Sequence, residues 1–279
     1  MSHELRTPLN GVLGMSELLM DTKLDTKRLH FSETLNRSAM SLLTVINDVL
    51  DFSKIEAGRL ELEHVDFDLN EEINDVLNML AVRAHAKGLE LACLVERDVN
   101  PWCIGDSLRI RQILTNLIGN AVKFTNVGEI VVKVAVLAKT DSHQALKFEV
   151  SDTGIGIDAN MHRKIFESFA QADGSTTRRY GGTGLGLAIA KQLIEKMRGD
   201  IAVRSTFGNG ATFTFDMTLE TGAPKDTAVQ PRNNLQGLRA LVVDDNATNR
   251  EILHYQLTGW NLAVDCVASG DEALKRLSA

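Results

Sequence analysis

A long helical repeat runs from Thr26 to Ala57 and limits the architectures open to the first part of the chain. Apolar residues recur in it at alternating steps of four and three, at Leu35, Ala39, Leu42, Ile46 and Val49. This spacing is typical of a coiled-coil seam. Leu43 and Leu50 add a second apolar stripe, and the combined face is wider than a contact between two helices needs. We therefore expect a four-helix bundle formed by a homodimer.

A shorter helical pattern precedes this repeat, and the polar residues 21–25 separate the two. Its apolar members are Leu5, Leu9, Val12, Leu13 and Leu19. The two segments predict an antiparallel helical hairpin, the all-α domain that we assign to residues 1–63. The second helix holds about 30 residues and the first about 20 at most, so at about 1.5 Å per residue their lengths do not match. We expect residues upstream of Met1 in a longer parent protein.

The periodicity changes to two after residue 58, which marks a strand and a second domain, at Val65, Phe67 and Leu69. Asn70 is predicted to cap a helix that ends before Gly88, and Asp106 to cap another that runs to about Lys123. Further strands are predicted at residues 129–137, 145–150, 201–205 and 211–219. This order predicts an α+β sandwich over residues 64–222, with the helices on one face of the sheet.

Residues 223–237 are predicted to be a linker, because the composition turns to Gly, Ala, Pro, Asn and Gln and includes two of the four prolines of the chain. A buried strand at 239–243 then ends in Asp244 and Asp245. A helix from about Thr248 to Leu257 and a strand at 261–267 follow. This is the opening βαβ unit of a doubly wound α/β domain, which residues 238–279 are too short to complete.

The overall composition describes an ordinary globular protein: 279 residues, 44% hydrophobic and 24% charged. A net charge of −7 argues against binding nucleic acid through its phosphates. Cys93, Cys103 and Cys266 lie far apart without C-x-x-C spacing, and we interpret them as reduced core thiols. No apolar run of about 18 residues and no signal peptide pattern is present. We expect a cytoplasmic chain that makes no membrane contact.

Polar residues form a stripe along the helix predicted at residues 106–123. They are Gln112, Asn116, Asn120 and Lys123, at steps of four, four and three. The alternative is a solvated helix face, but asparagine is a poor helix former and such faces favour Glu, Lys and Gln. Amide oxygens are hard ligands suited to Mg²⁺, and a nearby lysine suits phosphate oxygens. The stripe therefore suggests a site for a phosphate-bearing ligand.

Two glycine clusters support such a site. Asp152-Thr153-Gly154-Ile155-Gly156 closes a strand, and residues 181–186, Gly-Gly-Thr-Gly-Leu-Gly, open a helix. A glycine-rich turn at a helix N-terminus exposes backbone N–H groups to an anion such as a triphosphate. Asp152 is placed to accept a hydrogen bond from an adenine amino group, although Asp-x-Gly is also a common turn. A Rossmann site is disfavoured by the absence of a preceding βαβ pattern.

The segment between the clusters, residues 158–180, combines a predicted short helix containing Ile165, Phe166 and Phe169 with a polar stretch. It is interpreted as a lid over the nucleotide or as a plain surface loop. At the N-terminus, Glu4 is positioned to accept the proton of one His3 nitrogen and leave the other as a nucleophile. Pro8 should bend this helix close to His3. A charged first turn without function is the alternative for Glu4, Arg6 and Thr7.

These motifs together resemble the bacterial two-component sensor histidine kinases of the hybrid type, over nearly the whole chain. SHELRTPLNG is similar to the H box, NLIGNAVKFT to the N box, DTGIGI to the first G box, FESFAQAD to the F box and GGTGLGLAI to the second G box. Their order and spacing also agree. LVVDDN resembles the start of a receiver domain, so the resemblance implies that the βαβ segment at residues 238–279 is a receiver fragment.

The resemblance implies a role for each matching residue. His3 is the phosphoacceptor, Glu4 its general base, and Glu4 with Thr7 the pair used to dephosphorylate a partner regulator. ATP and Mg²⁺ are the implied cofactors, with Asp152 on the adenine and Asn120 a metal ligand. The implied nucleotide contacts are Asn116, Asn120, Lys123, Asp152, Gly154, Gly156, Gly182, Thr183, Gly184, Leu185 and Gly186. Asp244 and Asp245 form the implied acidic Mg²⁺ pair of the receiver.

The predicted function is autophosphorylation of His3 from Mg-ATP and transfer to an aspartate of a response-regulator receiver domain. That aspartate should close a third receiver strand, and the sequence stops before it. Sensory segments, and any inner-membrane anchor of the parent, would lie upstream of the H box. Two alternatives remain: a dimerising fragment that binds ATP without phosphotransfer, and an ATPase with the same type of nucleotide site.

Overall fold

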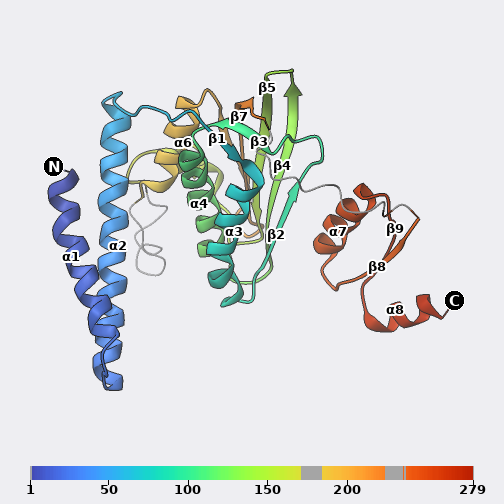
Figure 1. The fold of residues 1–279 in the computed structure, drawn as a ribbon, viewed down its shortest axis with the longest axis horizontal. Coiled ribbons are helices and arrows are strands. Elements are labelled where there is room, and N and C mark those ends of the chain that lie inside the picture. The colour runs from blue at the N-terminus through green and yellow to red at the C-terminus, as the bar shows by residue number, and fades with distance from the viewer. Residues whose placement is uncertain (1, 171–183, 224–234, 236, 279) are drawn as a thin grey trace. The chain divides into compact units, whose positions relative to one another are not determined.

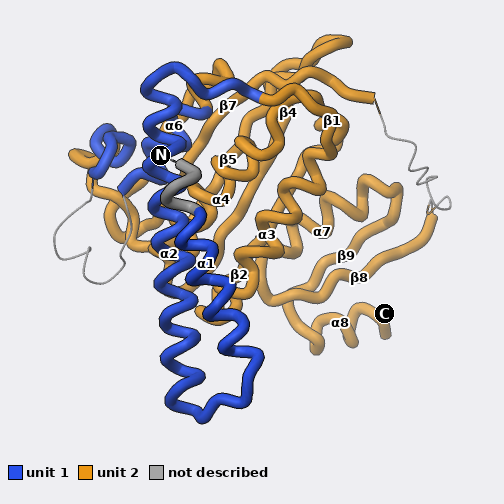
Figure 2. The backbone as a smooth tube through the Cα atoms, turned by 60° about the vertical axis from the view of Figure 1, so that its left-hand side comes forward, with its two compact units in different colours: residues 1–62, 163–193 blue, residues 63–162, 194–279 orange. Residues whose placement is uncertain are grey.

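The computed structural model describes residues 2–170, 184–223, 235 and 237–278. It divides into two compact units, shown in Figure 2: residues 1–62 with 163–193, and residues 63–162 with 194–279. Each unit is described by itself. No helix in the described part of the chain combines the length and the apolar character that a membrane span requires.

The first unit contains the predicted helical hairpin, formed by α1 (Ser2–Met20) and α2 (Thr26–Glu56). Asp25 caps α2 by accepting the Arg28 N–H at 2.8 Å. Leu9 and Leu13 of α1 are buried against Ala39 of α2, and Leu43 and Ile46 pack beside them. The hairpin is antiparallel, as predicted, because the more C-terminal residues of α1 contact the more N-terminal residues of α2 (Figure 1).

The predicted seam of α2 divides into two faces. Ala39 and Ile46 pack toward α1, whereas Leu35, Leu42 and Val49 are 49%, 51% and 42% exposed. These three residues repeat at intervals of seven, so they lie in one row along the helix. The row is an apolar surface that the hairpin does not use.

A seven-stranded sheet forms the second unit, in the order β1-β3-β7-β5-β4-β2 with β6 paired to β7. The strands are β1 (Val65–Asp68), β2 (Glu90–Val95), β3 (Trp102–Gly105), β4 (Glu129–Lys139), β5 (His143–Asp152), β6 (Ile201–Ser205) and β7 (Ala211–Thr221). Helices α3 (Leu69–His85) and α4 (Ser107–Phe124) cover one face of this sheet (Figure 1). Phe148 and Phe215 stack at 4.6 Å in the core beneath them. The α+β sandwich is therefore as predicted.

The structure corrects several local predictions. Asp68, not Asn70, caps α3, because its carboxylate accepts the N–H groups of residues 70 and 71. Strands β2 and β3 were not predicted, and β2 pairs parallel with β4. In place of one short helix containing Ile165, Phe166 and Phe169, there are two 3₁₀ turns, η1 (Ala159–Met161) and η2 (Lys164–Phe166). Residues 171–180 of the predicted lid lie outside the described part.

The C-terminal segment has β8 (Arg239–Val243), α7 (Ala247–Gly259), β9 (Ala263–Val267) and α8 (Gly270–Leu277). Strands β8 and β9 pair in parallel, so the βαβ prediction is confirmed, while its assignment to a receiver stays a prediction. Cys266 on β9 is exposed and is not the core thiol that we predicted. Cys103 is buried, and burial raises its pKa to about 11.

Candidate active site

Helix α4 presents the polar stripe. Asp106, only 3% exposed, caps the helix by accepting the Arg109 N–H at 3.0 Å, which fixes where the helix starts. The opposite face is buried in the sandwich core, at Ile110, Ile113, Leu114, Leu117, Ile118, Ala121 and Val122. With that face fixed, the periodicity of the helix turns the stripe away from the core.

The stripe is not a solvated helix face. Gln112, Asn116, Asn120 and Lys123 are all half-buried, whereas a solvated face would leave such side chains exposed. Burial also lowers the pKa of the Lys123 ammonium below its ordinary value. Three amides and an amine on one half-buried row offer oxygen ligands for a hard cation and a cation for phosphate oxygens.

Asp152 ends β5 and starts the turn that contains the first glycine cluster. Its carboxylate accepts the Gly154 N–H at 2.8 Å. Burial raises the pKa of this carboxyl above its ordinary value, and the Gly154 and Ala211 amides partly oppose that shift. The turn prediction and the ligand prediction for Asp152 are therefore compatible, because one carboxylate oxygen serves the turn and the other can accept a further donor.

The glycines of this turn are required by the backbone around them. A Cβ on Gly154 would lie 2.6 Å from the Phe124 carbonyl oxygen at the end of α4. Gly156 has φ +68°, and a Cβ there would lie 2.2 Å from the carbonyl oxygen of Thr206. The turn is therefore pressed against the end of α4 on one side and the β6–β7 connection on the other.

Thr125 belongs to this site although the sequence analysis gave it no role. It is fully buried at the end of α4, and its hydroxyl lies near enough to Asp152 to lower the pKa of that carboxyl. The contact is not an ordinary hydrogen bond, and the hydroxyl oxygen has no other partner in the described residues. The signal was available, since Thr125 is the last residue of the NLIGNAVKFT motif.

The second glycine cluster lies in the first unit, where Gly182 and Thr183 fall outside the described residues. Gly184 has φ +71°, and its carbonyl accepts the Phe169 N–H at 3.1 Å. Leu185 is buried, and α6 (Gly186–Lys196) begins directly after it. The prediction that this cluster opens a helix is confirmed. The N–H groups of such a first turn are without partners inside the helix and suit an anion.

The predicted catalytic residues lie in the first two turns of α1. The structure describes the backbone of His3 and Glu4 and not their side chains, while Thr7 is exposed. Their roles stay predictions, as does the bend at Pro8.

The predicted acidic pair closes β8. Asp244 is half-buried and accepts the Asn246 N–H at 2.8 Å, while Asp245 is exposed. Asn246 in turn caps α7. Two carboxylates therefore stand at the carboxyl end of a parallel strand, and their role as Mg²⁺ ligands stays a prediction.

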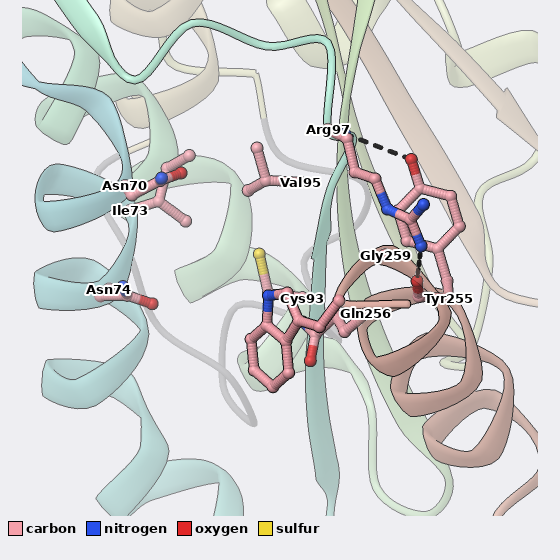
Figure 3. Close-up of a pocket in the computed structure, with 10 residues that line it drawn as sticks. Asn70, Ile73, Asn74, Cys93, Val95, Arg97, Tyr255, Gln256 and Gly259 are labelled. Atoms are coloured by element: carbon pink, nitrogen blue, oxygen red, sulfur yellow. Dashed lines mark hydrogen bonds between the residues drawn. The ribbon is translucent and has the colours of Figure 1, made fainter. Parts of the chain in front are cut away.

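One cavity of about 490 Å³ lies in the second unit, away from these residues. Figure 3 shows its lining, which comes from α3, β2 and α7 and from Arg97 and Trp260, which lie just after β2 and α7. Arg97 dominates one side, where its backbone N–H and its guanidinium both bond to Tyr255. None of the predicted nucleotide contacts lines this cavity, so it is distinct from the candidate site.

Comparison with known families gives two matches in one chain. Residues 1–58 match the His Kinase A (phospho-acceptor) domain, and residues 105–221 match the histidine kinase-, DNA gyrase B- and HSP90-like ATPases. The chain belongs to the histidine kinases. The first match contains α1 and α2, and the second contains the stripe, Asp152 and both glycine clusters. Residues 105–221 of this histidine kinase are thus an ATP-binding domain.

Individual relatives agree with the family. The histidine kinase is 47% identical to sensor protein GacS of Pseudomonas syringae pv. syringae over 257 residues, 92% of the chain and 28% of that protein. It is 47% identical to histidine-protein kinase BarA of Escherichia coli K12 over 220 residues, 79% of the chain and 24% of that protein. The chain therefore spans less than a third of the length of these relatives. The crystal structure of full-length ShkA in complex with AMPPNP is similar, with a TM-score of 0.78 and 35% identity over 98% of this chain and 56% of that one.

Proposed function

We propose that this histidine kinase transfers the γ-phosphoryl group of ATP to an imidazole nitrogen of His3. The observation that carries the proposal is the presence of a phospho-acceptor domain at 1–58 and an ATPase-type domain at 105–221 in one chain. The half-buried stripe of α4 and the Asp152 turn supply the chemistry for binding a nucleotide. The complex of ShkA with AMPPNP, an ATP analogue, also supports ATP as the donor.

The reaction forms an N–P bond at His3 and breaks the bond between the γ-phosphorus and the oxygen that bridges it to the β-phosphate. ADP leaves with the electron pair of that oxygen. Glu4 accepts the proton of the other imidazole nitrogen, which raises the nucleophilicity of the attacking nitrogen. Asp152 accepts a hydrogen bond from the adenine amino group, and Lys123 interacts with phosphate oxygens.

Asn116 and Asn120 are the residues that would hold Mg²⁺ together with the phosphates. The fit is good, because amide oxygens on one helix row suit a hard cation that is shared with a triphosphate. The described residues contain no cluster of three or more His, Cys, Asp or Glu side chains that could hold a metal without the nucleotide. When bound, Mg²⁺ neutralises charge on the phosphate oxygens.

A phosphohistidine is a good donor to a carboxylate, and we propose an aspartate of a receiver domain as the acceptor. Glu4 and Thr7 would also take part in removing the phosphoryl group from the receiver domain of the partner regulator. Asp244 and Asp245 would be the acidic pair of a receiver domain. The exposed row Leu35, Leu42 and Val49 supports a homodimer through α2, because burying it needs a second apolar surface.

Incubation of the chain with Mg²⁺ and γ-labelled ATP tests the proposal. We expect acid-labile, base-stable label on the wild type and none on His3→Gln. His30→Gln, an exposed histidine on α2, is the matched control and should keep the label. Release of labelled phosphate without protein label would favour an ATPase. Binding of ATP with neither product would favour a phosphotransfer-incompetent fragment.

A further inference from the structure

Lys87 binds the end of α4 with its side-chain ammonium. Its Nζ donates to the carbonyl oxygens of Val122 at 2.6 Å, Lys123 at 3.0 Å and Thr125 at 3.1 Å. All three protons of the ammonium therefore have acceptors. The positive charge also lies at the negative end of the helix dipole.

The carbonyls at this end of α4 are all accounted for. Ala121 O accepts the Thr125 N–H at 3.0 Å, and Phe124 O accepts the Ile155 N–H at 3.4 Å. The carbonyls of the two residues between them, 122 and 123, have no partner within the helix and are bonded by Lys87. Lys87 is therefore a C-terminal cap for α4 supplied from a distant part of the sequence.

A tight turn after α3 places Lys87 in this position. Gly88 has φ +69°, and its N–H bonds to His85 O at 2.9 Å. The Leu89 N–H then bonds to Ala84 O at 3.0 Å, and the Leu89 side chain is buried. This left-handed ending of a helix favours glycine and fixes the residue that precedes it.

The segment that Lys87 holds is the one that contacts the Asp152 turn. Phe124 provides the carbonyl against which Gly154 and Ile155 pack. Thr125 provides the hydroxyl that lowers the pKa of Asp152. Lys123 lies in the same segment, at the end of the stripe, and is the residue that we propose interacts with phosphate oxygens.

We propose that Lys87 is a positioning residue of the nucleotide site. This inference rests on the proposed function, because it assumes that the site binds ATP. It touches no nucleotide itself. It holds the last residues of α4 so that Lys123 and the Asp152–Gly154 turn keep the spacing that one ATP molecule requires. A purely structural role, in which Lys87 stabilises the fold without affecting nucleotide binding, is the competing interpretation.

The test compares Lys87→Met with Lys139→Met in the full chain. Lys139 is a matched control, because its Nζ also donates to a backbone carbonyl, that of Asp98, at 3.2 Å. It lies at the other end of β4 from the residue that pairs with Asp152. ATP dissociation constants are measured by calorimetry well below the thermal midpoint of each variant.

We expect Lys87→Met to weaken ATP binding about tenfold and Lys139→Met to change it less than about twofold. Lys87→Arg, which keeps a cationic donor, should recover part of the loss. Hydrogen exchange of the Ile155 amide should accelerate in Lys87→Met and not in Lys139→Met. If Lys87→Met fails to fold, Lys87→Arg and Lys87→Gln are compared instead, and Gln should bind ATP more weakly than Arg.

Two results would overturn the inference: unchanged ATP affinity in Lys87→Met despite a lower midpoint, or an equal loss of affinity in both methionine variants. If Lys87→Arg and Lys87→Gln are compared instead, an equal affinity of the two variants for ATP would also overturn the inference. Failure of the wild type to bind ATP would instead refute the proposed function. The calorimetric experiment measures ATP binding and not phosphotransfer. A loss of His3 labelling alone therefore tests neither the role of Lys87 nor the binding of ATP.

Discussion

Gly210 and Asp152 approach each other through their backbones: a Cβ on Gly210 would lie 1.9 Å from the Asp152 carbonyl oxygen. The backbone of Asp152 therefore lies against a residue without a side chain, directly before Ala211, its pairing partner in β7. Gly208, two residues earlier in the same connection, also has a positive φ, +87°, but a Cβ there would meet nothing within 4 Å. The two glycines separate the effect of backbone conformation from that of close packing.

Gly210→Ala should cost more stability than Gly208→Ala. Both substitutions place a Cβ in the left-handed region, at about 1 to 2 kcal/mol. Only Gly210→Ala also forces β7 away from β5, which we expect to add about 1 to 3 kcal/mol. Urea unfolding of the two variants measures the difference. Equal free energies of unfolding would show that the close approach is unimportant.

Asp152→Asn should weaken ATP binding and raise stability at neutral pH. A carboxyl whose folded pKa is raised opposes folding at every pH above that pKa, because the unfolded state ionises more easily. Removing the charge abolishes this penalty, while the adenine amino group loses an anionic acceptor. Denaturant unfolding and calorimetry report the two effects. Asp141→Asn, at an exposed position, is the control and should change neither.

The affinity for ATP should fall both at acid pH and at alkaline pH. On the acid side, affinity should fall at a higher pH than an ordinary aspartate would give, because burial raises the pKa of Asp152. On the alkaline side, it should fall at a lower pH than an ordinary lysine would give, because burial lowers the pKa of Lys123. Lys123→Arg should remove the alkaline limit, since arginine keeps its charge. A profile that Lys123→Arg leaves unchanged would contradict this assignment.

Leu42→Arg should convert a dimer into a monomer. Leu42 is the central residue of the exposed row on α2, and a buried arginine there has no partner of opposite charge within the row. Sedimentation velocity at micromolar concentration measures the change. Thr44→Arg places the same side chain on another exposed face of α2 and should leave the dimer intact. Dissociation of both variants to the same extent would place the contact elsewhere.

The sequence was sufficient where one signal dominated. The apolar repeat gave α2 almost to the residue, and the Asp106 cap with a regular core face gave α4. Strand β2 escaped prediction because Leu91 to Val95 is an apolar run without alternation, as both of its faces are largely covered. Strand β3 has only four residues and follows a proline, so it offers too short a pattern.

The helix cap at Asp68 was missed for a different reason. Asp68 ends a strand and starts a helix with no residue between them, and the period-two pattern hid its second role. The site residues carried by motifs could be predicted, and Thr125 was within reach as the last residue of such a motif, but Lys87 could not be predicted. Lys87 acts on carbonyls 35 to 38 positions away, and only the fold brings those partners together.

The parallel pairing of β2 with β4 has a consequence for how the molecule assembles. Glu90 pairs with Glu129, and the stretch between them contains β3 and all of α4. The polypeptide must close this long loop before the edge strand can join, which is a slow, non-local step. Because α4 lies within this loop, we expect the polar stripe of α4 to reach its final position in the same folding step that adds β2 to the sheet. Until this loop closes, neither the β2 edge of the sheet nor the α4 stripe that we propose binds ATP is in its final place.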